Sequence, residues 1–205
     1  MATTTTQSTI ATSQAELDAL LADLLPRQGR WDAEGYLWLT DQTNRLVEFT
    51  DGYIEVLPMP TDKHQAILKF FFLAFHAFVQ PRGVVQFSPL RVQVRPGAFR
   101  EPGLVLLHDA RGPRRENRYW LGADLVLEVV SPDKPARDLT EKRGDYARAG
   151  IPEYWIVDPQ VETIIVLRLD HGLYVEHGVF GRGTPATSAL LPGFAVAADG
   201  VFDAD

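Results

Sequence analysis

The segment from Asp124 to Asp158 constrains the fold of this chain more than any other part of the sequence. It begins with an apolar run of β-forming residues, Leu125 to Val130, which carries a single acid, Glu128, in its middle. A Ser-Pro break, a short helical pattern and a second apolar strand, Tyr154 to Val157, follow in that order. The apolar character of the first strand predicts that it is central in a sheet and covered on both faces. We therefore expect a mixed α/β fold.

Glu128 needs a partner, because a carboxylate on a buried strand is costly unless it meets a proton, a cation or a metal. Asp138, Lys142 and Tyr146 follow at steps of four, which places them on one face of the predicted helix. Since Ser131-Pro132 ends the strand and turns the chain back, this helix can project Lys142 over the strand end that holds Glu128. The pattern is typical of a metal-dependent phosphodiesterase site. Two structural interpretations stay open: a purely structural network around Glu128, and an exposed Asp138–Lys142 pair on an inert helix.

Length and composition exclude several classes of protein. The 205 residues suit one domain with a sizeable core, which we place at residues 14–205, after a disordered tail at residues 1–13 that has no features of a secretory signal. The lack of cysteine excludes disulfides and thiolate chemistry. No apolar run reaches the roughly 18 residues of a membrane helix, so we expect a cytoplasmic protein. The five histidines lack zinc-ligand spacing, and no phosphate-binding glycine loop indicates a nucleotide cofactor.

The net charge of −7 argues against tight, non-specific binding of nucleic acid. Any such contact must come from local basic patches, although these clusters can equally be solvated surface. One patch lies in a loop and the other beside the predicted site: Arg111, Arg114, Arg115 and Arg118; Lys134, Arg137, Lys142 and Arg143.

The rest of the chain alternates helical and strand patterns. We expect helices over residues 14–25 and 61–79, a hairpin over 45–57, strands over 84–87, 90–95 and 104–107, a helix that carries Lys142 and ends at 150–152, and a strand pair at 163–169 and 173–176. The hairpin turn, Asp51-Gly52, predicts a positive φ at Gly52. His64 opens the helix over 61–79, where a helix N-terminus attracts anions, but an exposed first-turn histidine fits equally well.

Three runs, DGYIEVLPMPTDKHQAIL, FREPGLVLL and ADLVLEVVSPDKPARDLTEKRGDYARAGIPEYWIVDP, resemble in order the Uma-two family of bacterial endonucleases, within the PD-(D/E)XK nuclease superfamily. The resemblance covers residues 37–174. It implies a restriction-endonuclease-like core with a mixed central β-sheet flanked by helices, DNA as the partner, and a site for Mg²⁺ or Mn²⁺ at one end of the sheet. Glu128 matches the acid of the second motif, which binds metal, and Lys142 matches a lysine moved onto the following helix. Glu48 and His64 match an acid and a histidine near the family's site, while Asp138, Tyr146 and Glu101 would support it.

One departure from the family pattern affects the metal. The first motif would read Arg-Glu-Pro-Asp, but this chain reads Arg100-Glu101-Pro102-Gly103, so a glycine replaces the aspartate that would hold the metal with Glu128. Loss of one carboxylate predicts weak binding of Mg²⁺. Glu101 points to the same side of an extended segment as Gly103, but about 7 Å away along it, so we do not expect it to restore the site.

The leading hypothesis is a metal-dependent endonuclease that hydrolyses DNA phosphodiester bonds and is impaired by Gly103. The alternative is a catalytically inactive nuclease-fold protein that binds nucleic acid or a protein partner. A small-molecule-binding α/β domain is the third hypothesis. These residues do not fix the oligomeric state, and a homodimer stays open. The active-site hypothesis predicts that Glu128 lies within about 7 Å of the Lys142 ammonium.

Overall fold

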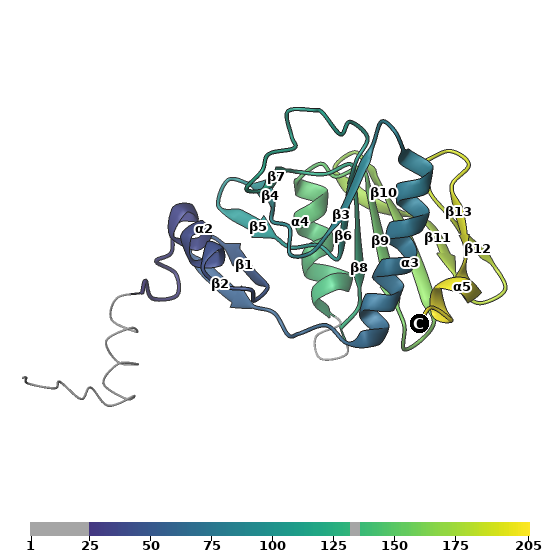
Figure 1. Ribbon diagram of the computed structural model, residues 1–205, viewed down its shortest axis with the longest axis horizontal. Coiled ribbons are helices and arrows are strands. Elements are labelled where there is room, and N and C mark those ends of the chain that lie inside the picture. Colours follow the sequence, from purple (N-terminus) through teal and green to yellow (C-terminus); the bar gives the residue numbers. More distant parts are fainter. Residues whose placement is uncertain (1–24, 132–135) are drawn as a thin grey trace, which may run out of the picture.

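A computed structural model describes residues 25–131 and 136–205 (Figure 1). The expected tail and the helix expected over 14–25 thus lie outside the described residues, except for Leu25. The elements run in this order: α2 (Ala33–Asp41), β1 (Val47–Thr50), β2 (Tyr53–Val56), α3 (Asp62–Val79), β3 (Val84–Phe87), β4 (Val92–Arg95), β5 (Ala98–Arg100), β6 (Leu104–Leu107), β7 (Trp120–Leu121), β8 (Leu125–Val129), η1 (Arg137–Glu141), α4 (Lys142–Arg148), β9 (Glu153–Asp158), β10 (Thr163–Asp170), β11 (Leu173–Phe180), β12 (Pro185–Thr187), β13 (Ala195–Ala197) and α5 (Ala198–Phe202).

The main sheet has six strands in the order β11-β10-β9-β8-β6-β3. Only β8 and β9 run parallel within it, because the π-helical turn η1 and helix α4 carry the chain back between them. The other neighbours are antiparallel. The sheet is therefore mixed, and the predicted mixed α/β fold is confirmed.

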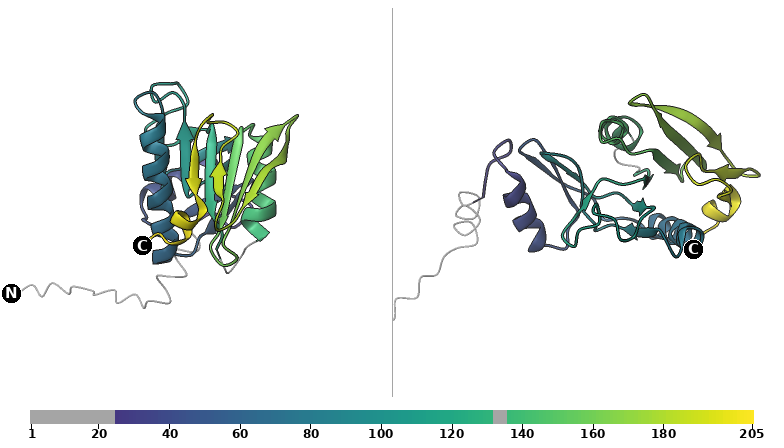
Figure 2. Two further views of the ribbon diagram at one scale, coloured as in Figure 1. Left: turned by 90° about the vertical axis from the view of Figure 1, so that its right-hand side faces the viewer. Right: turned by 90° about the horizontal axis from the view of Figure 1, so that it is seen from above.

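Helices α3 and α4 lie on opposite faces of this sheet (Figure 2). Leu127 of β8 belongs to the core on the α3 side, with Phe71 and Trp155, whereas Val126 belongs to the core on the α4 side, with Tyr146. Both β8 residues are fully buried, so the prediction of a central strand covered on both faces is confirmed. Because side chains alternate along a strand, Glu128 points to the same face as Val126, toward α4.

A second sheet, in the order β2-β1-β5-β4-β7, packs beside the first and contributes Glu48 from β1. The predicted β1–β2 hairpin is present, with φ of 47° at Asp51 and 90° at Gly52, as a type I′ turn requires. Any side chain at Gly52 would also place its Cβ 2.8 Å from the carbonyl carbon of Gly29. Glycine is therefore needed at this turn both for its φ and for its size.

The helix expected over 61–79 forms as α3, with Thr61 as its N-cap. Our sequence analysis missed α2, α5 and the short strands β5, β7, β12 and β13, and it ended the strand of β11 too early. Each of these missed elements is short or lacks a clear apolar period, so its position is set by tertiary pairing. None of the helices in the described part of the chain is long and apolar enough to cross a membrane.

Candidate active site

Glu128 lies near the end of β8 and receives three hydrogen bonds. The Lys142 ammonium donates to Oε1 at 2.8 Å, and the Tyr146 hydroxyl donates to the same oxygen at 2.6 Å. The Gly103 backbone N–H donates to Oε2 at 3.2 Å. The predicted closeness of Glu128 and Lys142 is confirmed, and residue 103 lies beside Glu128 as the resemblance implied.

Lys142 is shared among three carboxylates. Besides Glu128 it contacts Asp138 Oδ1 at 3.1 Å and Glu48 Oε1 at 3.7 Å. Lys142 and Asp138 are each only 4% exposed, so the interpretation of their spacing as an exposed surface pair is wrong. The buried ammonium of Lys142 thus provides positive charge for three acids that come from β1, β8 and η1.

Two arginines extend this network on the side of the second sheet. Arg137 donates to Glu48 Oε2 at 2.6 Å, and Arg100 lies 3.5 Å from the same oxygen. Arg100 also pairs with Asp145 of α4. Sequence analysis placed Arg137 only in a basic patch, named Arg100 only as part of the first motif and did not find Asp145, because no local pattern brings β5 against α4.

Burial and neighbouring charges shift the pKa values in this network. Burial raises the pKa of Glu128, and Lys142 only partly opposes it. Burial also acts to raise the pKa of Glu48, but Lys142, Arg137 and Arg100 together bring it below its usual value. Burial tends to lower the pKa of Lys142, whereas Glu128, Glu48 and Asp138 raise it overall. Lys142 therefore keeps its proton at any physiological pH.

Glu101 and His64 lie nearby but outside these ion pairs. Glu101 Oε2 accepts from the Val47 backbone N–H at 3.0 Å, and burial raises the pKa of Glu101 to about 7. His64 lies in the first turn of α3, where its backbone N–H donates to the Thr61 hydroxyl, and burial lowers its pKa. The structure thus gathers Glu128, Lys142, Asp138, Tyr146 and Glu48 into one network and places Glu101 and His64 at its border.

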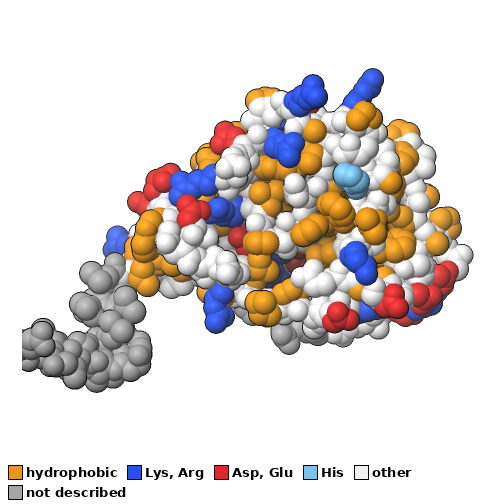
Figure 3. All heavy atoms as spheres, in the orientation of Figure 1, with side chains coloured by type: hydrophobic (Ala, Val, Ile, Leu, Met, Phe, Trp, Pro, Cys, Tyr) orange, Lys and Arg blue, Asp and Glu red, His pale blue; other side chains and the backbone are white. Residues whose placement is uncertain are grey.

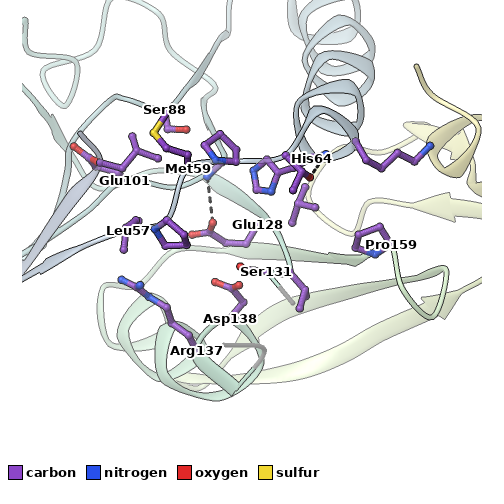
Figure 4. Close-up of a pocket in the computed structure, with 18 of the residues that line it drawn as sticks. Leu57, Met59, His64, Ser88, Glu101, Glu128, Ser131, Arg137, Asp138 and Pro159 are labelled. Atoms are coloured by element: carbon purple, nitrogen blue, oxygen red, sulfur yellow. Dashed lines mark hydrogen bonds between the residues drawn. The ribbon is translucent and has the colours of Figure 1, made fainter. Parts of the chain in front are cut away.

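A cavity of about 370 Å³ opens at this network. Figure 4 shows the carboxylates of Glu128 and Asp138 directed into the same space, with His64 and Met59 bordering it. On the face of the molecule seen in Figure 3, hydrophobic side chains are widespread and basic side chains are scattered. In the loop patch, Arg114 pairs with Asp124, and Arg118 pairs with Asp41. These contacts favour the interpretation of the loop arginines as solvated surface residues paired with acids.

The arrangement does not fit a divalent metal. Glu128 already accepts from an ammonium, a hydroxyl and a backbone N–H, and the residue beside it, Gly103, offers no carboxylate. A Cβ at Gly103 would lie 3.0 Å from both the Leu127 carbonyl oxygen and Leu68 Cδ2, so even a small side chain is crowded. Within residues 25–131 and 136–205, no three carboxylate or histidine side chains are arranged to hold a metal ion. The cation beside Glu128 is Lys142.

Comparisons with known proteins agree with this fold. A family model described as "Putative restriction endonuclease", the Uma-two model, matches residues 33–199. The crystal structure of a "putative nuclease belonging to DUF820" from Anabaena variabilis superposes with a TM-score of 0.67 at 21% sequence identity, covering 81% of this chain and 96% of the other. At that identity the likeness establishes the restriction-endonuclease-like fold alone. The comparison with curated proteins gives no match.

Proposed function

We propose that this protein, which belongs to the Uma-two family, binds nucleic acid at the cavity beside Glu128 without cleaving it. The observation that carries the proposal is the environment of Glu128. Its neighbour Gly103 supplies only a backbone N–H, which donates to Oε2. Lys142 and Tyr146 both donate to Oε1 from the side of α4. A carboxylate held in this way is a poor ligand for a metal.

Nucleic acid as the partner is supported by the family and by the nuclease-like fold. The overall acidity and the pairing of Arg137 and Lys142 with acids predict modest affinity with a small dependence on salt. A protein that held DNA mainly through free cations would show the opposite behaviour.

The test combines binding and cleavage. Fluorescence anisotropy with labelled single- and double-stranded DNA in EDTA should show binding without metal. Cleavage of the same DNA in Mg²⁺ or Mn²⁺ should be no faster than that of the Glu128→Ala variant, which also controls for contaminating nucleases. If neither form of DNA binds, nucleic acid is not the ligand of this cavity.

The second candidate is the endonuclease that the sequence predicts, with Mg²⁺ or Mn²⁺ as cofactor. The observation that favours it is the direct contact of Glu128 and Lys142 at the border of the cavity, since the resemblance assigns catalysis to this acid and this lysine. The endonuclease candidate requires that the hydrogen bond between Lys142 and Glu128 break. Cleavage that needs Mn²⁺ and disappears in Glu128→Ala would establish this candidate and reject the first.

A further inference from the structure

The cationic side chains that line the cavity beside Glu128 already have partners. Lys142 contacts three carboxylates, and Arg137 contacts Glu48 at 2.6 Å and Glu55 at 3.2 Å. Lys63 donates to the backbone carbonyl oxygens of Phe202 and Ala204. A phosphate that entered would have to displace one of these acceptors while close to several carboxylates. The cavity is therefore a poor receptor for an anion.

The carboxylates that line the same cavity retain capacity to accept hydrogen bonds. Among the described residues, the only donor to the Asp138 carboxylate is Lys142 at Oδ1, and the only donor to the Glu101 carboxylate is the Val47 N–H at Oε2. No fully buried side-chain oxygen or nitrogen in the described part of the chain lacks a partner, so the second oxygen of each must keep some access to open space. A ligand can reach the second oxygen of Asp138 with a hydrogen-bond donor, whereas the Glu101 carboxyl, whose pKa is raised to about 7, can both accept and donate near neutral pH.

The walls around these acceptors are apolar. Leu57, Pro58 and Met59 border the cavity on the linker before α3, and Val130 and Pro159 border it at the ends of β8 and β9. In Figure 4, Met59 and His64 lie on one side and Asp138 on the other, with Glu128 between them. A largely apolar ligand with N–H groups at one edge matches these acceptors and these walls.

We propose that the cavity receives a nucleobase that carries an exocyclic amino group, with the phosphates of its strand outside. The inference rests on the proposed function, because it names the part of the nucleic acid that enters. The amino groups of cytosine and adenine donate to carboxylates, whereas thymine presents carbonyl oxygens at the corresponding position. Since the base must leave its stack, single-stranded or unpaired bases should bind better than a duplex.

The experiment compares short homopolymers of dC, dA and dT, and one strand of abasic residues, by fluorescence anisotropy in EDTA. We expect dC and dA to bind about tenfold tighter than dT or the abasic strand. Asp138→Asn should bring dC and dT close to equal affinity. Asp145→Asn is the matched control, because Asp145 belongs to the same ion network but does not line the cavity.

Since Asp138→Asn also weakens the contacts of Lys142, a second variant, Glu101→Gln, is measured in parallel. Among the described residues the Glu101 side chain lines the cavity without forming an ion pair, and the Glu101→Gln variant should also reduce the preference for dC. Thermal melting establishes that each variant is folded. Free cytidine and inorganic phosphate are also titrated separately into the protein, and only cytidine should bind.

The outcomes separate the two proposals. Equal affinity for dC, dT and the abasic strand would overturn the base-binding inference and leave nucleic-acid binding intact. Cytidine binding without binding of any oligonucleotide would overturn the proposed function and support the base pocket. Phosphate that binds while cytidine does not would overturn the inference, and failure of all ligands would overturn both.

Discussion

Two buried acids on neighbouring strands of the main sheet are stabilised in different ways. Glu128, near the end of β8, contacts the ammonium of Lys142 and borders a cavity. Glu153 begins β9 and is fully buried, and its contacts are all neutral donors within 2.6–2.7 Å: Trp155 Nε1, Ser188 Oγ, Ala189 N and Leu190 N. Glu153 thus fixes the loop that contains Ser188 against β9.

The comparison shows that burial of an acid does not by itself identify a functional site. Neutral donors from one loop suffice to hold a structural carboxylate. At Glu128, by contrast, charged side chains from several elements lie together at the border of the cavity. The predictions below test this difference.

The largest expected effect comes from Lys142→Met. This change removes the cation that Glu128, Asp138 and Glu48 share, so we expect a loss of about 3–5 kcal/mol in the free energy of unfolding, measured by urea denaturation. The control is Arg148→Met, because Arg148 pairs with Asp145 at the surface and should contribute about 1 kcal/mol or less. A similar small loss in both variants would refute the central position of Lys142.

Glu101 predicts a dependence of stability on pH. Its pKa is raised to about 7 in the folded protein, so the folded state holds a proton that the unfolded state releases between about pH 4.5 and 7. The contribution of Glu101 to the free energy of unfolding is therefore highest at low pH, where Glu101 is protonated in both states. This contribution falls by roughly 2–3 kcal/mol as the pH rises through that window. Urea denaturation at pH 5 and pH 7.5 should show this loss in the wild type relative to Glu101→Gln. Equal pH dependence of the two proteins would exclude a raised pKa at Glu101.

Glu153→Gln should have a smaller effect than Lys142→Met. The amide keeps one acceptor oxygen but turns an NH₂ group toward donors, so we expect a loss of about 1–2 kcal/mol and no change in nucleic-acid binding. Melting curves and anisotropy measure the two quantities. Impaired binding with normal stability would show that the structural interpretation of Glu153 is wrong.

Gly103→Ala should have the smallest effect on stability, about 1 kcal/mol, because its Cβ would press on Leu68 and on the Leu127 carbonyl oxygen. Gly103→Asp adds a carboxylate beside Glu128 at the same place. Combination with Leu68→Ala gives the new carboxylate room beside Glu128. If a missing ligand limits catalysis, this double variant should cleave DNA in Mn²⁺ faster than Leu68→Ala alone. Addition of Glu128→Ala should abolish the gain.

Much of the site was predictable because its residues lie close together in the sequence. The acid within an apolar strand, the Ser-Pro break and the steps of four from Asp138 to Tyr146 place Glu128, Lys142 and Tyr146 together. The positions of Arg100 and Asp145 were not predictable, since they depend on how the three-residue strand β5 lies against α4. Glu153 was missed because its hydroxyl and backbone donors at residues 188–190 are 35–37 residues away.

The central claim is that the positive charge beside Glu128 belongs to Lys142 and not to a divalent ion. Titration calorimetry of the wild-type protein with Mn²⁺ tests it directly, with Glu128→Ala as the control. We predict the same negligible heat for both proteins, because the Glu128 oxygens already accept from Lys142, Tyr146 and Gly103. Stoichiometric Mn²⁺ binding by the wild type that is lost in Glu128→Ala would contradict the claim.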